Sequence, residues 1–213
     1  MSFIYYVRMR QEVFMNKDFW NERFLEKDVY GEDVNAFLKE QIKLLRAGAN
    51  ILCIAEGQGR NALYLSKQGF HVTAVDQSDI GINQIKEKAK VQNLLIEAYA
   101  AGLTDYDFGE NKWDAIVSIF GHLPSELRRK VHQKITKGLK KGGLFIMEAY
   151  SHDQLKYETG GPKSLDLLLS TDILKEELPD LKVIKLEQLE REVIEGKYHS
   201  GLSSVVQYIG LRD

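Results

Sequence analysis

The sequence of 213 residues has little cysteine, little proline and no excess of charge of either sign. Its one cysteine, Cys53, cannot form a disulfide within the chain, so a disulfide-stapled scaffold is excluded and a reducing cytoplasm is the expected location. Lys and Arg total 29 against 31 Asp and Glu. Because a basic surplus is the usual electrostatic sign of nucleic-acid binding, we expect no nucleic-acid partner.

Long hydrophobic runs are also absent. The longest apolar run near the start, Phe3–Val7, is too short for a signal-peptide core or a membrane span. We therefore expect neither a secretory signal nor a membrane partner. No repeat, low-complexity tract or linker interrupts the chain, so residues 1–213 are predicted to form a single domain. Within it, we expect residues 1–16 to be a flexible extension.

Short apolar runs alternate with amphipathic stretches in the predicted core, residues 50–150. Five runs are predicted as strands: Ile51–Ala55, His71–Asp76, Leu94–Tyr99, Ala115–Phe120 and Leu144–Tyr150. Apolar residues at helical spacing follow the second and fourth of these: Ile82, Ile85 and Ala89, then Leu127, Val131, Ile135 and Leu139. Strands that alternate with helices predict a mainly parallel sheet covered on both faces.

The segments on either side of this core have different patterns. Residues 17–46 are predicted to be cap helices with one apolar stripe: Val34, Leu38, Ile42 and Leu45. Residues 151–213 are predicted to hold a helix and a β-hairpin: Thr171–Leu178, Lys182–Ile194 and Tyr198–Leu211. Glu195–Lys197 separates the two β-like runs, and Gly196 can supply a tight turn. The sheet is therefore predicted to finish in an antiparallel pair.

The stretch Ile51–Ala62, ILCIAEGQGRNA, joins the first predicted strand to a helix through two glycines. Gly57 and Gly59 would let a ligand approach the backbone, and free amides at the helix start favour a carboxylate or phosphate. Asp76 ends the second strand, where an acid would accept hydrogen bonds from both hydroxyls of an adenosine ribose. The alternative is a plain glycine turn with a helix-capping aspartate. The strand, glycine pair, helix and acid together indicate a cofactor loop.

Five segments carry a family resemblance: AEGQGRNALYLSKQG, VTAVDQS, WDAIVSIFGHLP, LKKGGLFIMEAY and YETGGP. In their order and spacing they resemble class I S-adenosylmethionine-dependent methyltransferases, in the small bacterial branch related to tellurite-resistance and thiopurine methyltransferases. The likeness runs from Phe19–Phe24 to Gly201–Gln207. It implies an α/β fold, a doubly wound Rossmann-like sheet of seven mainly parallel strands whose last strand is antiparallel. It also implies S-adenosyl-L-methionine as cofactor, S-adenosyl-L-homocysteine as product and a small-molecule methyl acceptor as partner.

The resemblance also assigns residues to the cofactor. Its methionine end would be cradled by Ala55, Glu56, Gly57 and Gly59. Its adenosine would be held by Asp76 at the ribose, Gln77 beside the adenine, and Gly102 and Leu103 at the adenine's other edge. Ile119 would lie near the methyl-bearing sulfur, and Trp20 would cover the cofactor. Trp20 has a second interpretation, as an aromatic anchor that packs the first segment on the core.

Three positions depart from the family's usual pattern. Many relatives have an acid at the position of Cys53, a glycine at Ala55, and an Asp or Asn at Gly102. The change at Cys53 removes a supporting hydrogen-bond acceptor. Glu56 partly offsets this loss near the cofactor's ammonium group. The change at Gly102 removes an acceptor for the adenine amino group. Because the glycine pair and the ribose acid are present, we expect an altered but working site, with Cys53 packed inside its strand.

Direct in-line displacement is the expected reaction, because a sulfonium needs chiefly an aligned nucleophile. SIFGHLP follows the fourth strand, where open α/β sheets place their chemistry, and His122 is the candidate proton acceptor. Alternatively, His122 only orders the loop before Pro124. His199 could reach the same rim, although a solvent-facing histidine is the default expectation. Tyr30 with Gly31, and Thr159–Pro162, are expected at the rim, and no metal site is predicted.

Two other functions stay open. An NAD(P)-dependent oxidoreductase is one, because GQGRNA also fits the G-x-G-x-x-A pattern. The lack of a Tyr-x-x-x-Lys pair and the antiparallel ending speak against it. The other is a non-catalytic methyltransferase-like domain that binds cofactor or a partner, as the changes at Cys53 and Gly102 suggest. Thiols and chalcogen oxyanions are acceptors suggested by analogy alone, and neither the acceptor nor the oligomeric state is indicated.

Overall fold

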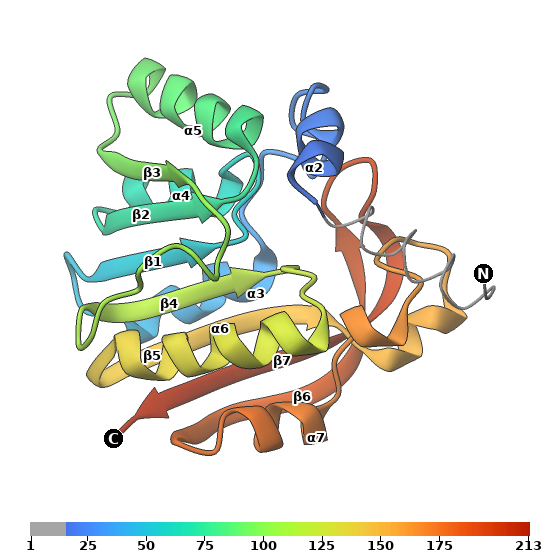
Figure 1. Ribbon diagram of the computed structural model, residues 1–213. Helices are drawn as coiled ribbons and strands as arrows, with labels where there is room; N and C mark the ends of the chain where they lie inside the picture. Colours follow the sequence, from blue (N-terminus) through green and yellow to red (C-terminus); the bar gives the residue numbers. More distant parts are fainter. Residues whose placement is uncertain (1–15) are drawn as a thin grey trace.

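Seven strands form one sheet in the order β3-β2-β1-β4-β5-β7-β6 (Figure 1). The computed structural model describes residues 16–213, so the expected extension lies outside the described residues apart from Asn16. The strands are β1 (Asn50–Ile54), β2 (His71–Asp76), β3 (Ile96–Ala100), β4 (Trp113–Ile119), β5 (Leu139–Tyr150), β6 (Leu181–Ile194) and β7 (Ser200–Arg212).

Strand direction follows the prediction. The pairs β3–β2, β2–β1, β1–β4 and β4–β5 are parallel, whereas β7 is antiparallel to both β5 and β6. The mainly parallel sheet with an antiparallel last strand is therefore confirmed. Strand boundaries differ from the predicted ones by up to five residues, since β5 begins at Leu139 instead of Leu144. At Leu139 the predicted element itself was wrong: the helical period includes this residue, but the preceding helix ends at Gly138 and Leu139 pairs with Trp113 in the sheet. A buried apolar residue fits either element, so periodicity alone could not separate them.

Helices cover both faces of the sheet (Figure 1). They are α2 (Lys17–Arg23), α3 (Ala36–Gln41), α4 (Arg60–Lys67), α5 (Asp79–Val91), α6 (Ser125–Gly138) and α7 (Thr171–Glu177), with the 3-10 helices η1 (Ile42–Leu44), η2 (His152–Lys156) and η3 (Leu165–Leu167). The side chains of Asn35, Ser78 and Ser170 accept a backbone N–H bond in the first turn of α3, α5 and α7. Such caps satisfy amides that have no partner within a helix, and so define where these helices begin.

Each face of the sheet has its own apolar core. In β1, Ile51 and Cys53 pack in the core that α3, α4 and α5 cover, whereas Leu52 and Ile54 pack in the core that α6 and α7 cover. This alternation is the period of two that a strand imposes. Burial on both faces explains why the predicted strands read as continuous apolar runs. Cys53 is fully buried, in agreement with its predicted packing role.

The connection between β6 and β7 is longer than the predicted turn. It comprises residues 195–199, and the N–H of Glu195 donates to the carbonyl of His199 at 2.7 Å. The loop also contacts the segment that follows α2, because the N–H of Lys197 donates to the carbonyl of Val29 at 2.9 Å. A Cβ on Gly196 would lie 2.4 Å from the backbone nitrogen of Gly31. The two segments therefore meet closely at the carboxyl edge of the parallel strands.

Within residues 16–213, no helix is both long enough and apolar enough to cross a bilayer. Across the same residues, no three His, Cys, Asp or Glu side chains come together in an arrangement that could hold a metal ion.

Candidate functional site

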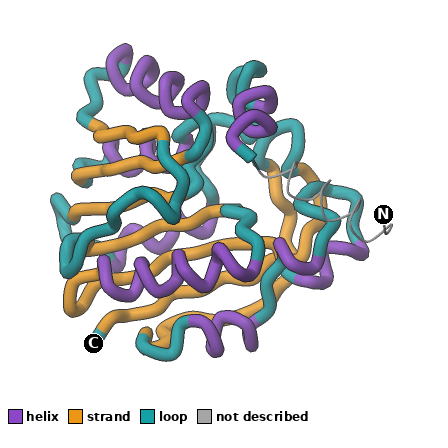
Figure 2. The backbone as a smooth tube through the Cα atoms, viewed as in Figure 1, coloured by secondary structure: helices purple, strands orange, loops and turns teal. Residues whose placement is uncertain are grey.

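A pocket of about 380 Å³ lies at the carboxyl ends of β1, β2 and β4. The loops that follow these strands gather at one edge of the sheet (Figure 2). The walls also include residues from α2 and from the loop between β6 and β7. Open α/β sheets bind ligands at this edge, and the volume is that of a small-molecule site.

All eleven residues that the sequence predicts to bind the cofactor or to act in catalysis line this pocket: Trp20, Ala55, Glu56, Gly57, Gly59, Asp76, Gln77, Gly102, Leu103, Ile119 and His122. Their common location is a property of the fold, and their roles toward a ligand stay predictions. Further lining residues were not assigned from sequence: Phe24, Gln58, Arg60, Asn61, Asp105, Leu123 and Leu127. Tyr30 and Gly31 line the pocket as well, where the sequence predicts a rim.

The loop after β1 has left-handed backbone at Ala55 (φ 51°), Gly57 (φ 59°) and Gly59 (φ 88°). Only glycine adopts this conformation without strain, which gives a physical reason for the glycine that relatives have at the position of Ala55. A Cβ on Gly59 would lie 2.5 Å from Cγ1 of Ile85. Gly59 is therefore needed to pack the loop against α5. The sequence suggests only the other reason, that a ligand approaches the backbone.

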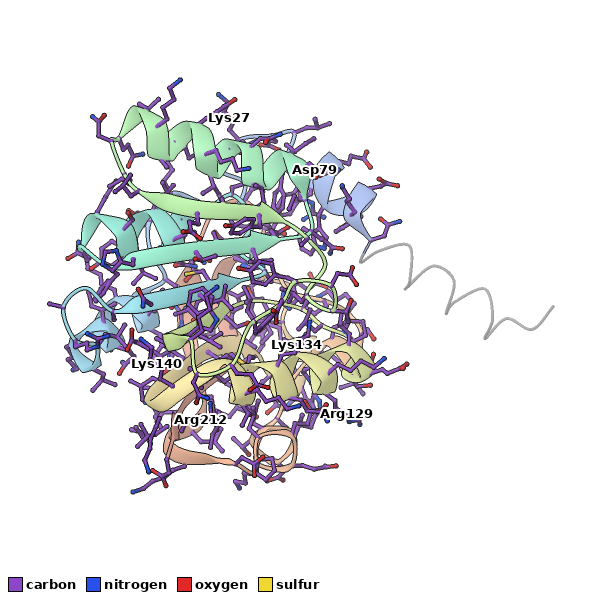
Figure 3. The ribbon with its side chains drawn as sticks, turned by 60° about the vertical axis from the view of Figure 1, so that its left-hand side comes forward. Lys27, Asp79, Arg129, Lys134, Lys140 and Arg212 are labelled. Carbon is purple, nitrogen blue, oxygen red and sulfur yellow. The ribbon has the colours of Figure 1, made fainter. Side chains whose placement is uncertain are left out.

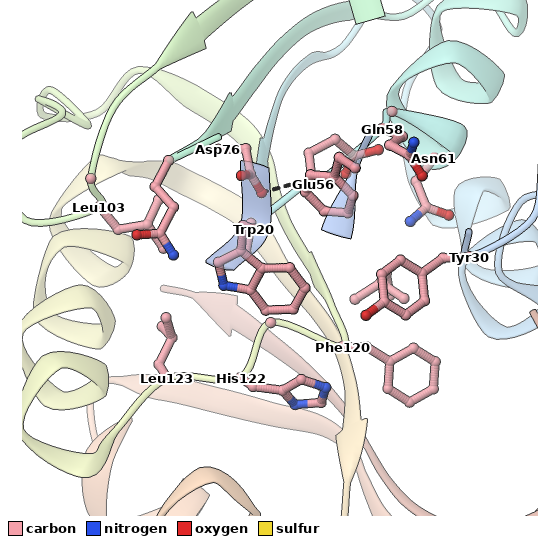
Figure 4. Close-up of a pocket in the computed structure, with 18 of the residues that line it drawn as sticks. Trp20, Tyr30, Glu56, Gln58, Asn61, Asp76, Leu103, Phe120, His122 and Leu123 are labelled. Atoms are coloured by element: carbon pink, nitrogen blue, oxygen red, sulfur yellow. Dashed lines mark hydrogen bonds between the residues drawn. The ribbon is translucent and has the colours of Figure 1, made fainter. Parts of the chain in front are cut away.

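Asp76 joins this loop to the end of β2 (Figure 4). Its Oδ2 accepts a hydrogen bond from the N–H of Gly57 at 2.8 Å, and its Oδ1 accepts one from the N–H of Ser78 at 2.8 Å. Burial raises the pKa of Asp76, and the backbone N–H bonds oppose that rise only in part. Since a carboxylate has about four lone-pair sites, the side chain keeps acceptor capacity for ligand hydroxyls.

Glu56 follows Ala55 and turns back on the start of α4. Its Oε1 accepts a hydrogen bond from the N–H of Ala62 at 2.7 Å. Burial raises the pKa of Glu56 to about 7, although the Ala62 N–H and the charge of Arg60 act in the opposite direction. The side chain therefore changes charge near neutral pH, and its ionised form suits a cationic group of a ligand.

The loop after β3 contains a carboxylate that the sequence analysis missed. A Cβ on Gly102 would lie 3.0 Å from Oδ2 of Asp105, so the Asp105 carboxylate occupies the space next to the missing side chain. Lys134 of α6 fixes the loop (Figure 3), because its Nζ donates to the carbonyls of Leu103 at 3.1 Å and Tyr106 at 2.8 Å. A hydrogen-bond acceptor is therefore present beside Gly102, because the loop brings the carboxylate of Asp105 to this position.

Rings surround the opposite end of the pocket, after β4. Phe120 has left-handed backbone (φ 51°), which turns the chain there, and His122 stacks on Tyr150 at 5.8 Å between ring centroids. The centroid of His199 lies 4.8 Å from that of Phe120 and 6.1 Å from that of His122. Burial lowers the pKa of His122 to about 4. The imidazole is therefore uncharged at neutral pH.

His199 does not face solvent, so the default expectation for it was wrong. It is 5% exposed and lines the pocket, and its Nδ1 is buried without a hydrogen-bond partner in the described part of the chain. Burial, and after it the nearby His122, Arg60 and Arg23, hold the pKa of His199 well below its ordinary value. The cause is tertiary, because the longer loop between β6 and β7 folds back against the segment after α2.

Trp20 fits both of its interpretations. It lines the pocket (Figure 4). It also stacks on Phe24, with 5.5 Å between ring centroids and 26° between the planes. The Oδ1 of the neighbouring Asn21 accepts a hydrogen bond from Oγ of Ser78 at 2.6 Å. Helix α2 is therefore anchored beside the cofactor loop and contributes an aromatic wall.

Thr159–Pro162, expected at the rim, is not among the residues that line the pocket. Gly160 instead forms a backbone bridge with His199, and Oγ1 of Thr159 donates to the carbonyl of Leu202 at 2.7 Å. The segment therefore packs against the start of β7 and against His199.

Comparisons with known proteins agree with this geometry. Residues 51–143 match the family model described as a methyltransferase domain. The glycine/sarcosine/dimethylglycine N-methyltransferase of Actinopolyspora halophila is 29% identical, over 64% of this chain and 26% of that protein. A protein of Haemophilus influenzae named "Probable S-adenosyl-L-methionine-dependent methyltransferase TehB" is 28% identical, over 65% of this chain and 47% of that protein. The chain thus spans half or less of the length of both relatives.

Solved structures share the fold. The crystal structure of TehB from Haemophilus influenzae superposes with a TM-score of 0.71 at 19% identity, over 92% of this chain and 67% of that one. Coclaurine N-methyltransferase, bound to N-methylheliamine and SAH, gives a TM-score of 0.61 at 23% identity, over 73% of this chain and 51% of that one. The seven-stranded arrangement is therefore common to chains of very different sequence.

Proposed function

The chain belongs to the class I S-adenosylmethionine-dependent methyltransferases, related to TehB, and from this premise we propose that it methylates a small-molecule acceptor by direct in-line displacement. The main observation in support of this proposal is that all eleven residues predicted to bind the cofactor or to act in catalysis line one pocket. When bound, S-adenosylmethionine supplies an electrophilic methyl group on a sulfonium sulfur. The chain's own residues bind that cofactor, orient it and exclude water from the acceptor.

The cofactor end of the pocket fits this molecule. Asp76 would accept hydrogen bonds from the ribose hydroxyls, while its bonds to the N–H groups of Gly57 and Ser78 hold the carboxylate in place. The ionised form of Glu56 would pair with the ammonium group of the methionine end. Asp105, beside Gly102, would accept from the adenine amino group. Each of these contacts binds or orients, and none requires chemistry from the protein.

The acceptor end provides alignment and excludes water. Ile119, Phe120 and Trp20 give it an apolar wall. His122 would be an unprotonated base at neutral pH, but a pKa of about 4 makes it a weak one. Its stacking on Tyr150 is equally consistent with ordering the loop before Pro124. We therefore propose that alignment supplies most of the rate enhancement.

A small acceptor is supported by the contacts over the pocket. The segment after α2 and the loop between β6 and β7 are joined by the Lys197–Val29 backbone bond and by a Lys197–Glu26 ion pair at 2.8 Å. Both segments border the pocket, through Tyr30 and His199, and we propose that their connection restricts the acceptor to a small molecule. Coclaurine N-methyltransferase, which shares the fold, is named together with a small bound molecule.

Calorimetry tests the proposal first at the cofactor. Adenosylmethionine and adenosylhomocysteine should bind with micromolar affinity, about −8 kcal/mol, and the nicotinamide nucleotides should not bind. The absence of heat at millimolar cofactor would overturn the assignment. Turnover of a panel of thiols, amines, phenols and chalcogen oxyanions then separates an enzyme from a domain that only binds. Cofactor binding with no turnover of any class would support the non-catalytic alternative.

A further inference from the structure

His199 is a buried ring of the pocket whose Nδ1 no contact of the described chain satisfies. It is 5% exposed, and this nitrogen has no hydrogen-bond partner within residues 16–213. Buried polar atoms are almost always bonded in native proteins, so an exception that lines a cavity indicates a place for a ligand group. The cofactor contacts proposed above leave this ring unused.

The loop that carries His199 is held firmly. Glu195, at its start, accepts hydrogen bonds from Nδ2 of Asn35 at 2.8 Å and from Nη2 of Arg191 at 3.2 Å. Glu195 also forms a buried ion pair with Arg60, the first residue of α4. Since α4 directly follows the glycine loop, the imidazole is fixed relative to the cofactor end of the pocket.

The charges of the lining disfavour an anionic acceptor. Three carboxylates line the pocket: Glu56, Asp76 and Asp105. The lining has a single cation among the residues described, Arg60, and the carboxylate of Glu195 neutralises it. An oxyanion would find no unpaired cation in this wall, within the described chain, to replace its hydration.

The acceptor end suits an uncharged, apolar body. Around His199 lie the rings of Tyr30 at 4.6 Å, Phe120 at 4.8 Å and Tyr150 at 5.2 Å between centroids. Figure 4 shows Tyr30, Phe120 and His122 on the same side of the pocket. Aromatic faces favour flat apolar groups, and a neutral imidazole adds one hydrogen-bond acceptor to them.

We propose that this end of the pocket binds an uncharged methyl acceptor with an apolar or aromatic body and a thiol, hydroxyl or amine hydrogen, and that His199 accepts the hydrogen bond from that group. This hydrogen bond would leave free the lone pairs of the sulfur, oxygen or nitrogen atom that receives the methyl group, and it would fix their direction. The inference rests on the proposed methyl transfer and narrows its substrate class. It excludes chalcogen oxyanions, which are charged and have no apolar body.

The test uses calorimetry on the full chain saturated with adenosylhomocysteine, with three probes of similar size. Benzyl mercaptan is uncharged and has a polar hydrogen, benzyl methyl sulfide lacks that hydrogen, and benzoate is an anion. We expect benzyl mercaptan to bind about fivefold more tightly than benzyl methyl sulfide, the worth of one neutral hydrogen bond, and benzoate to bind most weakly. Equal or tighter binding of benzoate or tellurite, or no heat from benzyl mercaptan at millimolar concentration, overturns the acceptor class.

Variants test the residue. His199→Phe keeps a ring in the cluster and should bind benzyl mercaptan about fivefold more weakly, with binding of benzyl methyl sulfide and adenosylhomocysteine unchanged. His199→Gln restores an acceptor atom and should recover part of the loss. His71→Phe, at the exposed start of β2, is the matched control. If His199→Phe binds benzyl mercaptan as the parent does, His199 is not the contact.

Failure of this inference is distinguishable from failure of methyl transfer. Loss of cofactor binding by the parent chain would refute the enzyme proposal. The probes can also be titrated without cofactor, so binding at the acceptor end is measured separately. Melting temperatures of the variants show whether a lost affinity reflects lost folding. If His199→Phe melts well below the parent, His199→Gln takes its place in the comparison. The proposal then requires that His199→Gln bind benzyl mercaptan less tightly than the parent does.

Discussion

Single residues divide the pocket into a charged and an uncharged end. Glu56 and Asp76 place two carboxylates at the cofactor end, and burial raises the pKa of both. His122 and His199 place two rings at the other end, and burial lowers the pKa of both. A cationic cofactor and a neutral acceptor would each meet the environment that suits it. Substitution of these residues, or a change of pH, should therefore affect the two ends differently.

Asp76→Ala should weaken adenosylmethionine binding at least tenfold, because it removes an ionised acceptor for two hydroxyls, each such bond being worth roughly 1.5–3 kcal/mol. The substitution also frees the N–H groups of Gly57 and Ser78, so the melting temperature should fall as well. Asp79→Ala, a half-exposed carboxylate at the start of α5, is the control. Parental affinity of Asp76→Ala would place the ribose elsewhere.

Cofactor affinity should depend on pH through Glu56. Its pKa of about 7 means that it is largely protonated at pH 6, and only the ionised form attracts an ammonium group. Affinity should therefore rise between pH 6 and 7.5 by up to about eightfold and then level off, with protons released on binding below pH 7. Calorimetry in phosphate and in Tris measures the released protons. Glu56→Gln should remove the dependence, and a flat profile of the parent would contradict the prediction.

His122 should not control the pH dependence of turnover near neutrality. Because its pKa is lowered to about 4, the ring is already unprotonated above pH 5, and any rise in rate from its deprotonation lies below that pH. With a thiol acceptor, we expect His122→Asn to keep most of the turnover, since an amide can replace the hydrogen bonds that order the loop. A loss of about a hundredfold in both His122→Ala and His122→Asn would instead establish a general base.

At the scale of elements, α6 supports the loop between β3 and β4. Lys134 donates to the carbonyls of Leu103 and Tyr106, and these bonds hold the loop that contains Gly102 and Asp105. The edge of the pocket that we propose for the adenine is thus supported by α6, although the residues at that edge follow β3. The support can be removed without touching the pocket lining.

Lys134→Met should lower the free energy of unfolding by about 1–3 kcal/mol, because the partly buried carbonyls of Leu103 and Tyr106 lose a charged donor. It should also weaken cofactor binding by about fivefold, as the loop must then be ordered by the ligand. Lys130→Met is the control, since Lys130 lies on the same helix and its ion pair is with exposed Glu126. Denaturant titration and calorimetry measure the two effects. An unchanged affinity would show that the loop is rigid without Lys134.

At the scale of the whole molecule, segments from both ends of the described chain close the pocket. Lys197 pairs with Glu26 across 171 positions of sequence, and Asn35 bonds to Glu195 across 160. Such contacts predict that residues 16–213 unfold as one unit, which is also what the predicted single domain requires.

Thermal unfolding should show one transition by circular dichroism and by tryptophan fluorescence. Adenosylmethionine at a hundred times its Kd should stabilise the chain by about 2.7 kcal/mol, a rise in melting temperature of roughly 5–10 °C. Two separate transitions, or a shift in only one of them, would show that the C-terminal hairpin unfolds apart from the cofactor core. The N-terminal and C-terminal walls of the pocket would then be independent of each other.

The amino-acid sequence by itself determined the sheet and the cofactor loop. Strand and helix periods are local, so the core strands, the antiparallel hairpin, and the spacing of Gly57, Gly59 and Asp76 could be read along the chain. Where two elements share one apolar residue, as at Leu139, the same local signal gave the wrong element. Where the backbone needs a left-handed conformation that only glycine adopts without strain, as at Gly57 and Gly59, the local signal gave the correct turn.

Only the tertiary structure decided what meets the loop. The burial of His199 and the ion pair of Arg60 with Glu195 both join segments whose local patterns do not indicate contact. The physical reason is that burial and electrostatic environment depend on neighbours far away in sequence, and periodicity carries no information about them. The residues that we propose for the cofactor could therefore be named from the sequence, whereas His199 joins the proposed acceptor end only through the contact between the segment after α2 and the loop between β6 and β7.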